Sequence, residues 1–230
     1  MLVFEYRFHF RLLKPVAYTK AAEAVSYFID SAFAKDEEFL RFHEKNEYKY
    51  YSFDLFYPCE ESGHYQAGKI YSVRIRTVRQ ELAEYFSQTL PCHRSEEMLG
   101  LNGELKIIPK KIIERIYSLT PVIIKTEDGY WRQHMSLPEF ENRIKVNLIK
   151  KYNQLTNSKI DEDFELYNLI VFKNTKPVKV PYKGIHLLGD KVNLTASNHP
   201  AAQELLYMSL GTGLGENNSR GAGFVNYRFL

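Results

Sequence analysis

The stretch from Leu210 to Val225, LGTGLGENNSRGAGFV, constrains the fold more than any other part of this 230-residue chain. Five of the 12 glycines of the chain lie within it. Glycine loses more conformational freedom on folding than any other residue. Such a density is therefore expected only where the backbone takes positive φ or lies directly against another group. The run predicts a tightly turned loop just before a final strand.

Two interpretations of this loop remain open from the residues themselves. Closely spaced glycines expose successive backbone N–H groups that bind anions such as phosphate, and Arg220 adds a planar charged group that suits phosphate. A hairpin loop rich in tight turns would need the same glycines without any ligand. Two glycine clusters around a polar, basic centre favour the polyanion-binding interpretation. The predicted contact residues are Gly211, Gly213, Gly215, Asn217, Asn218, Ser219, Arg220, Gly221 and Gly223.

Hydrophobic periodicity in the first half predicts a recognisable order of elements. Residues 2–12 alternate between an apolar face and a largely polar, basic face, which indicates a strand. A helix should follow with Thr19 as its N-cap and a buried face from residue 21 to residue 32. The next predictions are a helix over 36–45, strands over 49–57 and 69–79, a helix over 81–90 and a strand over 99–108. Apart from the additional short helix over 36–45, this is the β-α-β-β-α-β order of ferredoxin-like folds.

The second half repeats the theme. Strands are expected over 116–125, 164–172, 178–188 and 224–229, with helices over 139–155 and 201–209. The predicted fold is α+β, with two tandem ferredoxin-like domains and a C-terminal glycine-rich loop. The domains should span residues 1–110 and 111–230, because the chain turns polar over 109–114 between two strands.

Composition limits the function classes only loosely. A net charge of +3 allows a local nucleic-acid-binding patch without requiring one. The 17 tyrosines and 15 phenylalanines suit either base stacking or a β-rich aromatic core. Cys59 and Cys92 are far apart and outside any CxxC motif, so we expect reduced thiols of a cytosolic protein and no zinc site.

No cofactor, metal site or membrane contact is expected from the remaining motifs. The seven histidines show no HExxH spacing. Charges interrupt the first residues, where a signal peptide would be apolar, and no run approaches the roughly 20 apolar residues of a membrane span. The expected localisation is cytoplasmic.

The element order and the glycine run together resemble the repeat-associated RNA-binding superfamily of CRISPR systems. Residues 213–225, GLGENNSRGAGFV, closely resemble the signature of its Cas-six branch, the endoribonucleases that cut CRISPR repeat transcripts into guide RNAs. Residues 39–44, FLRFHE, with Lys49 six positions after the histidine, resemble the family's catalytic region. The stretch LTPV at 119–122 is similar to the start of the family's second half.

The resemblance implies three catalytic candidates. His43 would move protons, and Lys49 would steady the charge that builds on the phosphate. Some members carry a catalytic tyrosine in the first helix. An ungapped alignment places Phe28 there, on the buried face, so Tyr27 would take this role only after a shift of one residue. From the residues alone, His43 would equally suit a solvated helix end, and Lys49 an ordinary strand end.

Other residues are weaker candidates for RNA contact. Arg74 and Arg76 share one face of their strand, which would suit either RNA or solvent. His9 lies among basic residues on the polar face of the first strand and would suit RNA contact. Trp131 would either stack on a base or anchor the core, and we favour the core.

The implied function is metal-independent cleavage of CRISPR repeat RNA. The 2′-oxygen would attack the phosphorus, leaving 2′,3′-cyclic phosphate and 5′-hydroxyl ends. One alternative is a catalytically inactive member that binds repeat RNA as a subunit of a CRISPR effector complex. Another, a small-molecule enzyme with a nucleotide on the glycine loop, is disfavoured because this loop precedes a strand instead of opening a helix. Repeat RNA is the expected partner, other effector subunits stay open, and both a monomer and a homodimer are allowed.

Overall fold

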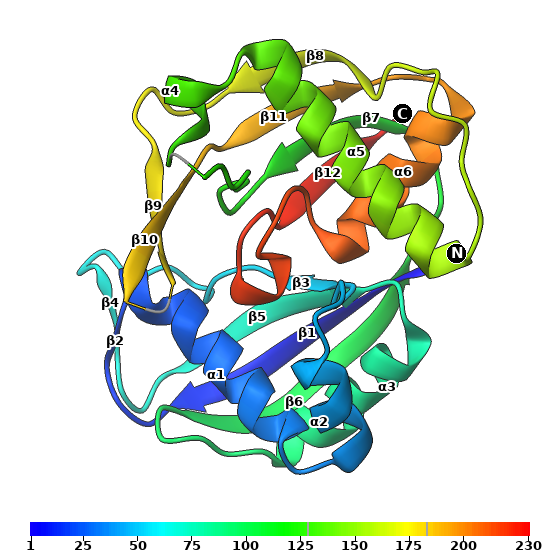
Figure 1. The fold of residues 1–230 in the computed structure, drawn as a ribbon. Coiled ribbons are helices and arrows are strands. Elements are labelled where there is room, and N and C mark those ends of the chain that lie inside the picture. Colours follow the sequence, from blue (N-terminus) through cyan, green and yellow to red (C-terminus); the bar gives the residue numbers. More distant parts are fainter. Residues whose placement is uncertain (128, 183) are drawn as a thin grey trace.

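The chain folds into two α+β halves, each built on a four-stranded antiparallel sheet (Figure 1). The computed structural model describes residues 1–127, 129–182 and 184–230. The strand order is β3-β5-β1-β6 in the first sheet and β12-β7-β11-β8 in the second. In both sheets the first strand of the half lies between the third and the fourth, which is ferredoxin-like topology. The predicted fold class, two tandem ferredoxin-like units, is therefore confirmed.

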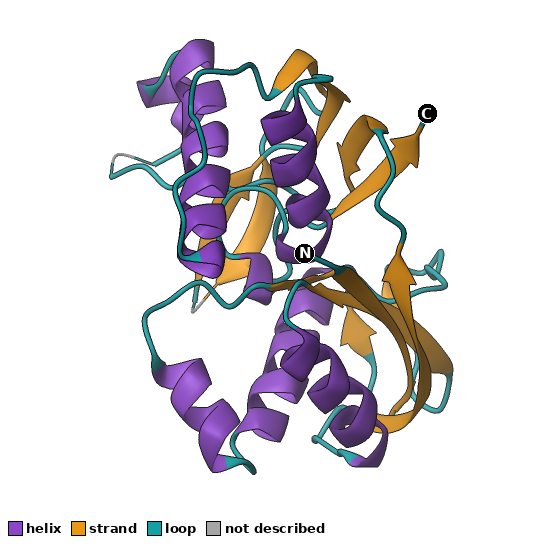
Figure 2. Cartoon of the chain, turned by 90° about the vertical axis from the view of Figure 1, so that its right-hand side faces the viewer, coloured by secondary structure: helices purple, strands orange, loops and turns teal. Residues whose placement is uncertain are grey.

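The first half follows the predicted order with two small additions. Its main elements are β1 Val3–Leu12, α1 Ala21–Phe33, α2 Glu37–Glu44, β3 Tyr51–Phe53, β5 Ile70–Thr77, α3 Gln80–Thr89 and β6 Met98–Ile108. The additions are a short ribbon of β2 Val16–Ala17 with β4 His64–Tyr65, and 3₁₀ turns at Tyr18–Lys20 and Leu90–Cys92. In the lower part of Figure 2 the helices lie on one side of this sheet.

The second half follows a connection over residues 109–112, between β6 and β7. Its elements are β7 Ile113–Ser118, α4 Trp131–His134, α5 Leu137–Thr156, β8 Tyr167–Phe172, β9 Val178–Tyr182, β10 Ile185–Gly189, β11 Val192–Ala196, α6 Pro200–Thr212, a 3₁₀ turn Asn218–Arg220 and β12 Val225–Phe229. No helix among the described residues is long and apolar enough to cross a membrane.

Each half has its own apolar core. In the first, the alternating side chains Tyr6, Phe8 and Phe10 of β1 pack beneath α1, where Phe8 stacks on Phe28 at 5.5 Å between ring centroids. In the second, Trp131 stacks on Phe140 of α5 at 4.0 Å and donates a hydrogen bond to the buried Asp190. Trp131 is therefore a core anchor, as the favoured interpretation predicted.

Three local predictions were wrong. The expected strand over 116–125 ends at Ser118, because the chain then turns and forms isolated bridges at Val122 and Ile123. The expected strand over 178–188 is the hairpin β9–β10, whose turn contains Gly184 at φ +81°. The third strand of the four-stranded sheet in the second half is β11, which we did not predict.

The start of α1 also differs. Thr19 lies in the preceding 3₁₀ turn, and Lys20 occupies the N-cap position without a side-chain hydrogen bond. Because the 3₁₀ turn runs directly into α1, there is no extended residue at Thr19 whose hydroxyl would accept from the first turn of the helix. The predicted cap is therefore wrong.

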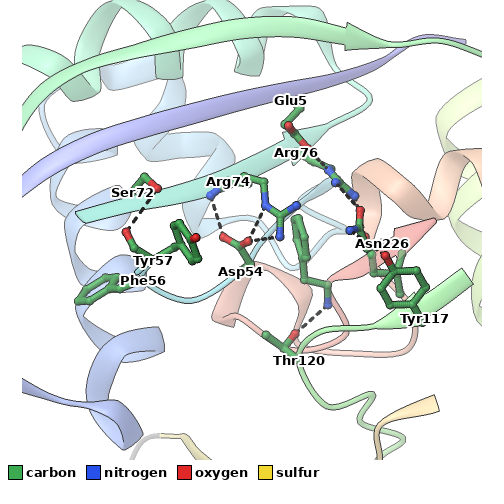
Figure 3. A network of polar contacts seen from close by, with 12 residues as sticks. Glu5, Asp54, Phe56, Tyr57, Ser72, Arg74, Arg76, Tyr117, Thr120 and Asn226 are labelled. Carbon is green, nitrogen blue, oxygen red and sulfur yellow. Dashed lines mark hydrogen bonds and ion pairs between the residues drawn. The ribbon is translucent and has the colours of Figure 1, made fainter. Parts of the chain in front are cut away.

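Arg76 of β5 joins the two halves at the open face of the first sheet. Its side chain is 1% exposed and pairs with Glu5 of β1 at 2.7 Å. The same guanidinium donates to the backbone oxygen of Val225 at 2.6 Å and to the amide oxygen of Asn226 at 3.2 Å (Figure 3). A buried charge is tolerated only when it is paired and hydrogen-bonded, and here three acceptors satisfy it. The side chain thereby fastens β12 to the first sheet.

The glycine run forms a compact loop between α6 and β12, which lies between the two halves in Figure 1. A Cβ atom on Gly221 would lie 2.9 Å from both Ala22 of α1 and Phe53 of β3. A Cβ atom on Gly223 would lie 1.9 Å from the oxygen of Leu214. Both glycines also have positive φ. Their glycine identity is therefore required by packing within the protein itself.

We expect Gly223→Ala to destabilise the protein much more than Gly63→Ala. Both residues have positive φ, +65° and +74°, but no described atom lies within 4 Å of the Cβ position at Gly63. Backbone strain alone should lower the free energy of unfolding by about 1 kcal/mol in Gly63→Ala. The added steric overlap should bring the loss in Gly223→Ala to about 3 kcal/mol or more. Denaturant unfolding of both variants measures the difference, and equal losses would contradict the packing argument.

Candidate active-site cleft

A cleft of about 590 Å³ opens between the segment after α2 and the glycine loop. Its walls come from residues 43–51, Lys125 before α4, three residues of α5, Tyr182 of β9, Thr212 of α6 and residues 215–220. His43, Lys49 and Arg220 all line it, so the structure brings the two sequence-predicted motifs together. These motifs are more than 160 residues apart in the sequence, and their meeting depends on the packing of the two halves.

The position of His43 follows from the construction of α2. Asp36 caps the helix by accepting from the backbone N–H groups of Glu38 and Phe39 at 2.9 and 3.1 Å. Phe39 then stacks on Phe33 of α1, which fixes the apolar side of α2. His43 lies in the last turn of α2, with its side chain 26% exposed at the cleft.

Asp30 of α1 connects His43 with the glycine loop. One carboxylate oxygen lies 3.3 Å from Nδ1 of His43, and the other pairs with the guanidinium of Arg220. The carboxylate faces Nδ1 and favours the tautomer with a proton there, so Nε2 is the nitrogen available for proton transfer. The sequence analysis missed Asp30. The only sequence pattern that points to Asp30 is the position of this acidic residue off the buried face of α1.

Lys49 closes the C-terminal end of α2. Its ammonium donates to the backbone oxygens of Phe42, His43 and Lys45 at 2.6, 2.9 and 2.5 Å. The last carbonyls of a helix lack partners within the helix, and a lysine in this position satisfies them. Burial lowers the pKa of Lys49. The side chain of Lys49 holds the backbone of His43 in place, and its positive charge lies at the wall of the cleft.

Tyr27 does not reach this cleft, although it was a catalytic candidate. Its ring is 55% exposed and lines a different groove with Lys20, Glu23 and Glu96. Phe28, the residue of the ungapped alignment, is buried in the first core. The catalytic assignment of Tyr27 is therefore wrong, because its ring lines this other groove and not the cleft that contains His43.

Tyr51 is the tyrosine that the fold places near Asp30 and Arg220. It follows Lys49 closely in the sequence and is 2% exposed. Burial raises the pKa of Tyr51 well above the usual value for tyrosine. Its hydroxyl forms a hydrogen bond with Ser219 of the loop. A fully buried neutral phenol supports the loop and does not supply a proton near neutral pH.

The loop presents its central residues to the cleft and its glycines to the protein. Positive φ occurs at Gly213, Gly215, Gly221 and Gly223, and a Cβ atom at each would lie 2.9 Å or less from atoms of the chain itself. Gly211 belongs to α6 and faces Val78. Gly211, Gly213, Gly221 and Gly223, which we expected at the RNA, therefore pack inside, whereas Gly215 and residues 216–220 line the cleft.

Asn217 and Asn218 differ in their contacts: Asn217 lines the cleft, and Asn218 also bonds within the loop. Asn217 takes left-handed backbone geometry at φ 58° and lines the cleft. Asn218 is 8% exposed, and its amide nitrogen donates to the backbone oxygens of Leu214 and Ala222 at 2.9 and 3.0 Å. These two bonds cross-link both sides of the loop and hold its width.

The two arginines of β5 behave differently from one another. Arg76 is buried, and its guanidinium is bonded to Glu5 and to the backbone of Val225. Its predicted role in RNA contact is therefore wrong. Arg74 pairs with Asp54 at 2.6 Å and keeps its side chain 25% exposed. It lines a second hollow together with Arg7, His9, Tyr57 and Lys191, on the open face of the first sheet. Figure 3 shows Arg74 with its partner Asp54.

Metal-ligand clusters and paired thiols were not expected. Within the described part of the chain, no group of three or more His, Cys, Asp and Glu side chains could hold a metal ion. Cys59 and Cys92 are both free and exposed. The polar groups of the cleft are those of His43, Asp30, Lys49, Arg220 and their neighbours.

Solved structures with this fold include several Cas6 proteins. A CRISPR associated protein Cas6 matches with a TM-score of 0.72 at 21% identity, covering 98% of this chain and 99% of the other. A Cas6-related protein from Pyrococcus furiosus matches with 0.67 at 17% identity over 98% of both chains. A Cas6 product complex from Thermus thermophilus matches with 0.64 at 16% identity over 99% of both.

The family assignment comes from the sequence of the second half. No curated protein sequence matches the chain significantly. Residues 103–227 match the family model described as CRISPR associated protein Cas6, C-terminal. The match includes β7, both main helices of the second half and the whole glycine loop. Because this model covers more than half of the chain, the protein belongs to the Cas6 family of CRISPR proteins.

Proposed function

We propose that this protein is a metal-independent endoribonuclease that cleaves CRISPR repeat transcripts to mature guide RNAs. The observation that carries the proposal is the cluster of His43, Asp30 and Arg220 at the cleft, where an acid–base group and a phosphate-binding cation meet. Solved Cas6 structures include a product complex and a substrate mimic complex, which supports an RNA-processing role for this fold.

The proposed chemistry is an internal transfer of the phosphate. The 2′-oxygen forms a bond to phosphorus while the bond from phosphorus to the 5′-oxygen breaks. His43 acts here as the imidazolium: its Nε2 gives a proton to the leaving 5′-oxygen, and the 2′-hydroxyl proton passes to water. The neutral imidazole that remains keeps its Nδ1 proton beside Asp30 and takes a proton back from water after the step. Asp30 stabilises the imidazolium from the Nδ1 side at 3.3 Å. The products carry 2′,3′-cyclic phosphate and 5′-hydroxyl ends.

Two cations would stabilise the charge that grows on the phosphate oxygens. Arg220 is 30% exposed in its side chain and offers the edge of its guanidinium that does not face Asp30. Lys49 contributes its charge from the end of α2, with its three N–H groups directed to backbone oxygens. A fixed charge in a partly desolvated cleft acts without reorganisation during the reaction.

The inactive RNA-binding subunit remains the second candidate because His43 is the one histidine among the described residues that line the cleft. Tyr27 lies outside the cleft and Tyr51 is 2% exposed, so we assign the proton transfer to His43. The endoribonuclease is preferred because one well-placed histidine already supplies general acid catalysis. A wild-type protein that binds repeat RNA tightly and never cuts it would establish the alternative.

The second hollow would extend the RNA-binding surface. Arg74, Arg7 and Lys191 bring positive charge to the open sheet face, and the ring of Tyr57 is 70% exposed beside them. Cations with an exposed aromatic ring form the usual surface for single-stranded nucleic acid. We propose that a part of the repeat RNA away from the cut site lies here.

We expect His43→Ala to slow cleavage at saturating RNA by at least about a hundredfold, since it removes the general acid. RNA affinity should change little. His64→Ala, at an exposed histidine of the short ribbon in the first half, is the matched control and should cleave like the wild type. Single-turnover cleavage of the host's repeat RNA measures the rates. Near-normal cleavage by His43→Ala would move catalysis away from this cleft.

Cleavage should persist in excess EDTA, because the proposed steps use only side-chain groups. Mapping of the end groups should find 2′,3′-cyclic phosphate and 5′-hydroxyl. Loss of activity on chelation that Mg²⁺ or Mn²⁺ restores would contradict this mechanism.

Arg220→Ala should weaken binding of repeat RNA and lower the salt slope by about 0.7, the value for one phosphate contact on a single strand. Arg228→Ala is the control, because it also breaks an arginine–carboxylate pair, with Glu114, and lies outside the cleft. Melting temperatures of both variants separate lost contact from lost folding. Normal RNA binding by Arg220→Ala would show that the loop makes no phosphate contact through this side chain.

A further inference from the structure

Lys151 of α5 is a buried lysine beneath the glycine loop, and neither the family match nor the proposed chemistry uses it. The residue is 3% exposed, whereas its neighbour Lys150 on the same helix is exposed. Its ammonium donates to the backbone oxygens of Gly213 and Gly215 at 3.2 and 2.9 Å and to the amide oxygen of Asn218 at 2.7 Å. A charge without water around it requires such compensation.

The three acceptors come from three separate points of the loop. Gly213 follows α6, Gly215 begins the turn, and Asn218 starts the 3₁₀ segment that leads to Arg220. Asn218 in turn donates to Leu214 and Ala222 on either side. Three acceptors match the three N–H groups of an ammonium, so Lys151 is the hub of the loop's internal bonds.

The same lysine is connected to the cleft. Arg220, two residues after Asn218, pairs with Asp30 beside His43. The hydroxyl of Tyr50 donates to the backbone oxygen of Lys151 at 3.3 Å, which joins α5 to the segment after α2. Movement of the loop at Asn218 would therefore move the arginine that faces the phosphate.

We propose that Lys151 is a positioning residue whose buried ammonium holds Gly213, Gly215 and Asn218, and so keeps residues 216–220 in the conformation that presents Arg220 to an RNA phosphate beside His43. The part that concerns RNA rests on the proposed function. The part that concerns the order of the loop does not.

The burial of Lys151 makes this arrangement sensitive to pH. Burial lowers its pKa to about 7. The titratable groups that face it are Glu216 of the loop, whose charge favours the ammonium, and the phenols of Tyr48 and Tyr50. Burial raises the pKa of both tyrosines, so both stay neutral when Lys151 titrates. A neutral amine has two N–H groups for three acceptors, so the loop loses one bond above neutral pH.

The stability of the folded protein and the order of the loop should then rise together with pH. Between about pH 7 and about pH 10 the unfolded chain keeps the lysine proton that the folded protein has lost. The unfolded state binds more protons there, so this group adds stability to the folded state as pH rises. An opened loop hydrates Lys151 and keeps its proton in the same way, so the closed loop also gains stability over this interval.

The first experiment is hydrogen exchange of the free protein over residues 211–223, with Lys151→Met compared with Lys150→Met. Methionine keeps the length of the side chain and removes its charge. We expect at least about tenfold faster exchange in Lys151→Met, because three buried acceptors lose their donor. Exchange equal to that of the wild type would overturn the proposal. If Lys151→Met does not fold, the wild type decides: corrected loop exchange must fall from about pH 6 to about pH 9, the interval that spans the titration.

The second experiment measures affinity for the host's repeat RNA over the same pH range. Lys151→Met should bind about tenfold more weakly than Lys150→Met at about pH 6, and the difference in affinity should remain at about pH 9, where neutral Lys151 still donates to the loop. A loosened loop with unchanged RNA affinity would overturn the positioning role. If the wild type neither binds nor cuts repeat RNA, the proposed function fails, and the exchange result still decides whether Lys151 holds the loop.

Discussion

The packing of the glycine loop against the first half is the interaction on which the candidate site depends. Gly221 lies against α1 and β3 so closely that a Cβ atom there would be 2.9 Å from Ala22 and Phe53. This approach brings Arg220 within ion-pair reach of Asp30, which also faces His43. The geometry of the candidate site is therefore a consequence of close backbone packing.

Buried charges maintain this arrangement at two places. Arg76 joins the first sheet to β12 through Glu5 and the backbone of Val225, and Lys151 holds the inside of the loop through three oxygen acceptors. Each charge is expensive to desolvate, and three oxygen acceptors compensate each of them. Unlike apolar contacts, these bonds have direction, so they specify one orientation of the halves and one shape of the loop.

Much of the fold was predictable from local patterns, and particular residues show why. Alternation along β1, the stripe of α5 and the cap at Asp36 each depend on neighbours a few positions away. The hairpin β9–β10 was read as a single strand because the alternation continues on both sides of Gly184. In the site, Arg220 was found from the chemistry of the glycine run, and His43 and Lys49 through resemblance to a family. Asp30 had only a weak signal, as an acidic residue off the buried face of α1, and Tyr51 and Lys151 carried none.

The sequence by itself determined the two ferredoxin-like units, the loop with its obligatory glycines and the histidine near the end of α2. Each of these follows from propensity, periodicity or a short motif. Only the tertiary structure decided that Tyr27 lies outside the cleft, that Arg76 is buried between the halves and that Lys151 becomes the partner of the loop. The physical reason is that exposure and electrostatic partners depend on how elements distant in sequence pack, which no local pattern encodes.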